Sequence, residues 1–188
     1  MNAASRAKAI LFDPVAEWTK IEEDDDDPAH VLTHYVALLA LIPALCGLIG
    51  AGLIGVVGPD GETVRAPLFD QLFGAVFGYV MACAIALLLG LVVDLLAPVF
   101  GGKKDFDKAF ALAVYSFTPV WLAGVFLLLP GLRFLTLAGF YGIYIFATGL
   151  PLLMKSPPSH TFRYAAVIAV SALVLTLGVA AAKSALFG

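Results

Sequence analysis

Five long apolar stretches constrain this chain more than any other feature of its sequence. A hydrocarbon core of about 30 Å needs about 20 helical residues to cross it, and each stretch is long enough. None alternates polar and apolar residues as a barrel strand would, so we expect helices. The sequence therefore predicts an all-α integral membrane protein, a five-transmembrane-helix bundle. The expected spans are about residues 32–57, 72–100, 109–129, 134–154 and 164–187.

Composition supports this class of protein and excludes others. Apolar residues make up 61% of the 188 residues and charged residues 13%, so a soluble globule could not bury its apolar surface. Lys and Arg set the expected orientation, because basic loops stay in the cytoplasm. The tail and the loops after the second and fourth expected spans hold most of the 11 basic residues. We therefore expect a cytoplasmic N-terminus and, after five spans, a periplasmic C-terminus.

Residues 1–31 are expected to form a cytoplasmic acidic tail, and residues 32–188 the membrane domain. Asp13 can cap a helix that begins at Pro14. Leu11, Val15, Trp18 and Ile21 then recur near helical spacing, with Glu17 and Lys20 opposite. The pattern predicts a short amphipathic N-terminal interfacial helix with Trp18 at headgroup depth, and a frayed tail is the alternative. Residues 22–27 are six consecutive acids, typical of a solvated linker or, alternatively, a partner contact.

Small residues recur every fourth position in the second span. This spacing predicts a helix-packing ridge, since small side chains let a neighbouring backbone approach closely in a membrane. The ridge fits packing within the chain, and a homodimer face is the alternative. Its members are Gly74, Gly78, Ala82, Ala86 and Gly90.

Pro119 lies inside the third span and is expected to kink it. Proline has no N–H, so the carbonyl of Tyr115 loses its helical donor, and Ser116 or Thr118 can satisfy it.

Asp94 is expected to face the bundle interior, because a carboxylate in hydrocarbon costs about 2.5–3.5 kcal/mol. It is expected to take part in a polar layer at one depth of the bundle. The layer is either structural or lines a cavity that binds a headgroup or a cation. The candidate cluster is Asp94, Tyr115, Ser116, Thr148 and Ser171.

No catalytic pattern stands out in the sequence, so we expect a non-enzymatic protein without a cofactor. A phosphate-binding loop, an HExxH zinc motif and a nucleophile elbow are all absent from the sequence. His30 and His34 are four residues apart and make a conceivable metal site, which we do not favour. Cys46 and Cys83 lie in apolar runs and are expected to pack as small hydrophobic side chains.

Four segments between and within the spans resemble a known family of membrane proteins. They are residues 95–104 (LLAPVFGGKK), 113–124 (AVYSFTPVWLAG), 141–144 (YGIY) and 149–155 (GLPLLMK). Each is similar to the corresponding stretch of the bacterial Yip (Ypt/Rab-interacting-protein-like) family. The resemblance implies five spans in the bacterial inner membrane with a cytoplasmic N-terminus. Eukaryotic members bind prenylated Rab-type GTPases, but a short acidic tail replaces their long cytosolic region here, and we expect no such partner in a bacterium.

The sequence thus favours a membrane-organising or partner-binding subunit. Its expected partners are the lipid bilayer and other membrane proteins or a second copy of the chain, with no nucleic acid. The candidate cytoplasmic contact comprises Trp18, Lys103 and Lys104. A small-solute, ion or lipid transporter working as a homo-oligomer is the alternative. Five spans leave no complete inverted repeat in one chain, which counts against it.

Overall fold

The computed structural model describes residues 2–24, 27–57, 62–65 and 67–187. Five helical segments are long and apolar enough to cross a membrane, and this confirms the predicted five-helix bundle. Each begins three to six residues before the predicted start. The helices begin earlier because their first turns contain polar residues or proline, which lie outside the apolar stretches used for the prediction. The spans are Pro28–Gly52, Leu68–Phe100, Phe106–Leu128, Gly131–Leu153 and Pro158–Ala185.

The first and second spans form an antiparallel pair. The first combines α3 (Pro28–Val31), the π-helical η1 (Leu32–Val36), α4 (Ala37–Leu48) and the π-helical η2 (Ile49–Ile54). A two-stranded ribbon of β1 (Val56–Val57) and β2 (Thr63–Val64) then leads to α5 (Leu68–Leu96) and the 3₁₀ turn η3 (Ala97–Phe100). The sequence analysis placed residues 56 and 57 in the first span, but they pair antiparallel with the second strand instead.

The third and fourth spans are each built from several helical pieces. The third comprises α6 (Phe106–Ser116), α7 (Thr118–Ala123) and the 3₁₀ helix η4 (Gly124–Leu128). The fourth comprises the 3₁₀ helix η5 (Pro130–Phe140) and α8 (Tyr141–Leu153). The last span is the single long helix α9 (Pro158–Phe187).

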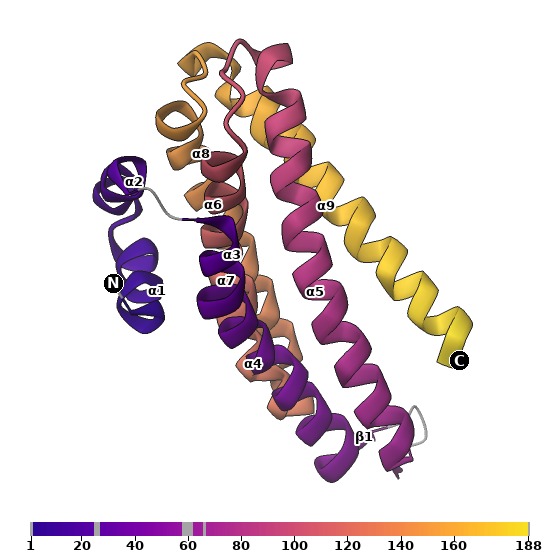
Figure 1. Ribbon diagram of the computed structural model, residues 1–188. Coiled ribbons are helices and arrows are strands. Elements are labelled where there is room, and N and C mark those ends of the chain that lie inside the picture. The colour runs from indigo at the N-terminus through magenta and orange to yellow at the C-terminus, as the bar shows by residue number, and fades with distance from the viewer. Residues whose placement is uncertain (1, 25–26, 58–61, 66, 188) are drawn as a thin grey trace.

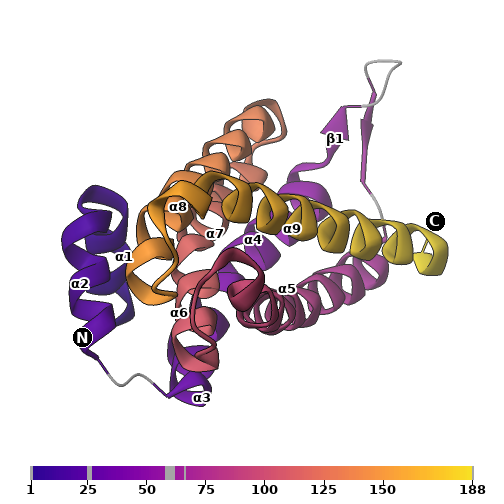
Figure 2. The same ribbon diagram turned by 90° about the horizontal axis from the view of Figure 1, so that it is seen from above.

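The third span lies at the centre of the bundle, where α6 packs against α5 and α8. Figure 1 shows α9 crossing behind α5 and diverging from the other helices toward the C-terminus. Accordingly, α9 is the least buried of the five spans and the third span is the most buried. The view along the bundle in Figure 2 shows α1 and α2 beside it, on the side of α8.

Two N-terminal helices precede the first span, α1 (Ala3–Phe12) and α2 (Pro14–Glu23). As predicted, α2 begins at Pro14, and the carboxylate of Asp13 accepts a hydrogen bond from the Ala16 N–H at 3.3 Å. The sequence analysis did not predict α1, which the side chain of Asn2 caps by accepting from the Ser5 N–H at 2.8 Å.

Candidate functional site

The helix pair α1–α2 is docked on the bundle through Trp18. The indole is 0% exposed, and its N–H donates to the carbonyl of Ile145 at 3.0 Å and to the hydroxyl of Thr148 at 3.2 Å. Gly149 makes room for it, because a Cβ there would lie 2.5 Å from the indole Cε2. The protein itself therefore covers this side chain, so α2 does not present Trp18 to lipid or to a partner as the sequence suggested.

The buried face of α2 also differs from the prediction. Glu17 was expected on the outer face, but it is 1% exposed, whereas Val15 is 60% exposed. The reason is a charge partner on α1: Arg6 donates to Glu17 Oε1 at 2.8 Å. A buried carboxylate is tolerated when a buried guanidinium pairs with it.

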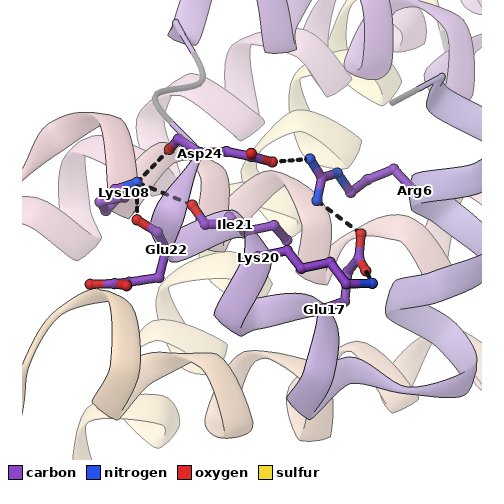
Figure 3. Close-up of polar contacts among 7 residues, drawn as sticks. All are labelled: Arg6, Glu17, Lys20, Ile21, Glu22, Asp24 and Lys108. Atoms are coloured by element: carbon purple, nitrogen blue, oxygen red, sulfur yellow. Dashed lines mark hydrogen bonds and ion pairs between the residues drawn. The ribbon is translucent and has the colours of Figure 1, made fainter.

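Arg6 joins the two ends of α2, as Figure 3 shows. Its second nitrogen donates to Asp24 Oδ2 at 2.5 Å, and its guanidinium carbon lies 5.6 Å from the ring centre of Tyr115. Burial on its own would lower the pKa of Arg6, but the hydrogen bond to Asp24 and the charge of Glu17 raise it above its ordinary value. The arginine therefore remains a permanent cation at the centre of a neutralising network.

Lys108 of α6 holds the C-terminal end of α2. Its ammonium donates to the backbone carbonyls of Ile21, Glu22 and Asp24 at 3.1, 2.7 and 2.6 Å (Figure 3). A cation at this position satisfies carbonyls that have no helical partner and interacts favourably with the helix dipole. A second lysine acts nearby, since Lys155 pairs with the Glu22 carboxylate at 2.6 Å and lowers its pKa.

The five residues of the candidate polar cluster have different neighbours. Thr148 accepts the indole N–H of Trp18 and donates to the carbonyl of Ile145 at 2.7 Å. The Tyr115 ring packs edge-on against Tyr35, with ring centres 4.8 Å apart.

The other three members of this cluster, Asp94, Ser116 and Ser171, also have different surroundings. Ser171 donates to the Val167 carbonyl of its own helix at 2.9 Å. Among the described residues, Asp94 Oδ1 and Ser116 Oγ are buried without a hydrogen-bond partner.

The helix of the third span is interrupted at Phe117, two residues before Pro119, where α6 ends and α7 begins. The Thr118 hydroxyl donates to the Tyr115 carbonyl at 2.7 Å, so it satisfies the acceptor that proline leaves open. The Tyr35 hydroxyl lies 2.7 Å from the Thr118 oxygen and donates to it, because the single Thr118 proton is already used.

The small-residue ridge of α5 meets different surroundings along its length. At Gly90 an added Cβ would lie 3.0 Å from the Phe110 Cα, and Ala86 is buried. At Gly74 it would meet the Lys183 side chain at 3.1 Å. Gly78 faces open space, and Ala82 is only partly buried. Within the chain the ridge is therefore packed around Gly90 and at Gly74 but not at Gly78, where the homodimer alternative stays a prediction.

The surface of the described residues is hollowed beside α9 and again where α2 meets α6. An apolar groove of about 360 Å³ runs between α9 and the third and fourth spans, with Ser116 in its wall. A second hollow of about 350 Å³ lies where α2 meets α6 and is lined by Asp24, Asp27, Asp105 and Asp107 beside Lys108. No group of three or more metal-ligating side chains occurs in the part of the chain that the structure describes. Lys103 and Lys104 are exposed on the loop between η3 and α6.

Sequence reasoning missed Arg6, Glu17, Asp24 and Lys108 as parts of the docking site. The available signal was the excess of charge near the N-terminus together with Trp18. Charges at helical spacing from an aromatic residue can face a protein surface as well as water. Only the position of α6 and α8 distinguishes the two cases.

These features define an all-helical, multi-pass membrane protein with a helix pair clamped to its side. The chain belongs to the Yip1 domain family, whose model matches residues 8–181. It is 27% identical over 176 residues to the inner membrane protein YohC of Escherichia coli K12, covering 91% of this chain and 90% of that protein. The same figures hold for YohC of E. coli O6:H1. No solved structure matches the chain. By homology it is a multi-pass protein of the inner membrane, and the resemblance found in the loop motifs is confirmed.

Proposed function

We propose that this Yip1-domain protein is a non-enzymatic partner-binding or membrane-organising subunit, and that the outer face of α1–α2 binds its protein partner. The observation that carries the proposal is the clamped helix pair. Its inner face is fixed by Trp18 and Arg6, while Phe12 and Val15 at the turn between the helices are 82% and 60% exposed. Rigid elements that present exposed apolar side chains beside polar ones are typical of protein interfaces.

Site-specific photocrosslinking in cells tests this proposal. A photoreactive phenylalanine analogue placed at Phe12 should give a defined protein adduct that mass spectrometry identifies. The same analogue at Phe162, which is 84% exposed near the start of α9, is the matched control. An adduct with a different membrane protein supports the subunit role. An adduct with a second copy supports a homo-oligomer, the arrangement that the transporter alternative requires, and the absence of any protein adduct at position 12 contradicts the proposal.

We also infer a cytoplasmic N-terminus and a periplasmic C-terminus. The inference rests on the basic residues of the tail and of the loops around Lys103 and Lys155, since basic loops stay in the cytoplasm. In a background without Cys46 and Cys83, an impermeant thiol reagent added to intact cells should label a cysteine at Glu62 and should not label one at Asp105. The reverse pattern would invert the orientation.

A further inference from the structure

The loop between η3 and α6 and the loop between α8 and α9 are joined into one platform. The Lys103 N–H donates to the Met154 carbonyl at 2.8 Å, and the His160 Nδ1–H donates to the Phe100 carbonyl at 2.9 Å. Gly102 permits the contact, because a Cβ there would lie 2.7 Å from the Met154 oxygen. The two loops therefore hold their side chains in a fixed arrangement at one end of the bundle.

This platform carries positive charge that the protein does not neutralise. Lys103, Lys104 and Arg163 are exposed, and within the described ranges none of them makes an ion pair. Lys155 differs, since its ammonium is paired with Glu22. Unpaired cations at a membrane surface attract anionic headgroups.

The apolar groove lies within the membrane-spanning segments below this platform. On α9 its wall runs from Ala165 to Thr176, and the small side chains of Ala169 and Ala172 leave room in it. These positions lie about 10 to 27 Å from the start of α9 at 1.5 Å per residue. Half of a hydrocarbon core is about 15 Å, so the groove begins in the leaflet next to the platform and continues past the bilayer centre.

One polar group in the groove wall has no partner. Ser116 is 5% exposed, lines the groove, and its hydroxyl makes no hydrogen bond among the described residues. Ser116 lies ten residues after Phe106, about 15 Å into the third span, so it marks the depth of the groove near the bilayer centre.

We propose that the groove and the platform together bind one anionic glycerophospholipid. One acyl chain lies in the groove between α9 and α8, and the phosphate meets the unpaired cations of the platform. This assignment does not depend on the identity of any protein partner. A negative headgroup is required because Lys103, Lys104 and Arg163 bring three positive charges without an ion-pair partner in the described part of the chain, whereas the nearby acids Asp105 and Asp107 line the hollow against α2.

Native mass spectrometry of the full chain in detergent, titrated with phosphatidylglycerol or phosphatidylcholine of identical acyl chains, tests the proposal. Phosphatidylglycerol should bind at least tenfold more tightly. The variant K103Q/K104Q should lose about fivefold in affinity for phosphatidylglycerol for each charge removed and change little toward phosphatidylcholine. The control K8Q/R65Q removes two exposed charges elsewhere and should bind as the wild type does. Equal affinity for the two lipids, or an equal loss in the control, would overturn the headgroup assignment.

A second pair of variants tests the groove itself. Ala169→Leu places a larger side chain in the groove, whereas Ala166→Leu makes the same change on the exposed side of α9. Binding of both lipids should fall at least tenfold in the first variant and stay unchanged in the second. Wild-type binding by a folded Ala169→Leu protein would overturn the groove as the acyl-chain site. If that variant does not fold, the loop variants still decide the proposal, because Lys103 and Lys104 are exposed.

Discussion

The indole of Trp18 occupies the space that the missing side chain of Gly149 leaves on α8. A Cβ on Gly149 would lie 2.5 Å from the indole Cε2 and 2.8 Å from Leu112 Cδ1. Both neighbours are fully buried, so neither can move into free space. Helix α2 can therefore dock in this position only because residue 149 is a glycine, which has no Cβ.

Replacing Gly149 with alanine should release α2 from the bundle. Overpacking a filled site costs about 1–3 kcal/mol, which exceeds the helix propensity of about 1 kcal/mol that alanine gains over glycine. In a Trp121→Phe background the emission of Trp18 should shift to longer wavelength, and the thermal midpoint in detergent should fall. Gly178→Ala is the matched control, since a Cβ there meets nothing within 4 Å. Unchanged Trp18 emission in Gly149→Ala would show that the site is not filled as described.

The sequence could predict the spans but not the surface on which the tail docks. Length and hydropathy determine that five helices cross the membrane, and these are local properties of the chain. The pattern around Trp18 is amphipathic whether the apolar face meets lipid or protein, so it cannot distinguish an interfacial helix from a docked one. The deciding residue, Gly149, lies in the fourth span, and nothing local to the tail indicates it.

Arg6 should be required for docking because it is the buried charge partner of Glu17. In Arg6→Met the carboxylate of Glu17 loses its buried partner and keeps only the exposed Lys20, whose ammonium lies 3.0 Å from Oε2. The loss is expected to destabilise the docked helix pair by up to about 3–5 kcal/mol. Limited proteolysis of the protein in detergent should then cut within residues 3–23. The double variant Arg6→Met/Glu17→Leu removes both charges and should regain most of the protection. If the double variant is cleaved as fast as the single one, the loss of protection does not come from the buried Glu17 carboxylate.

Glu22 should make docking of α2 sensitive to acid. Lys155, through its hydrogen bond and its charge, holds the pKa of Glu22 below its ordinary value. A lowered folded-state pKa adds stability above the pKa of the undocked glutamate, and this stability is lost as the pH falls through the docked pKa. Trp18 emission should therefore shift on acidification below about pH 4.3, the ordinary glutamate value. The variant Lys155→Met should lose the salt-sensitive part of this acid response. An identical pH titration of Trp18 emission in the wild type and in Lys155→Met would exclude the Glu22–Lys155 pair as the source of the response.

The polar layer expected around Asp94 illustrates a second limit of sequence reasoning. Depth along a helix follows from residue counts, but the direction of each side chain depends on how the helices are rotated. Thr148 accepts a hydrogen bond from Trp18, whereas Ser116 lies in the wall of the groove. The third span is also interrupted between α6 and α7, which a count along a single unbroken helix does not include.

The ridge of α5 gives the last prediction, because its glycines differ in surroundings although their spacing is regular. A Cβ at Gly90 would meet the backbone Cα of Phe110 at 3.0 Å, whereas one at Gly78 would meet nothing within 4 Å. Gly90→Ala should therefore separate α5 from α6 and lower the thermal midpoint in detergent by the equivalent of about 1–3 kcal/mol. Gly78→Ala should leave it unchanged or raise it by up to about 1 kcal/mol through helix propensity. Equal destabilisation by both would mean that Gly78 is also covered in the membrane, as a homodimer through this face would require.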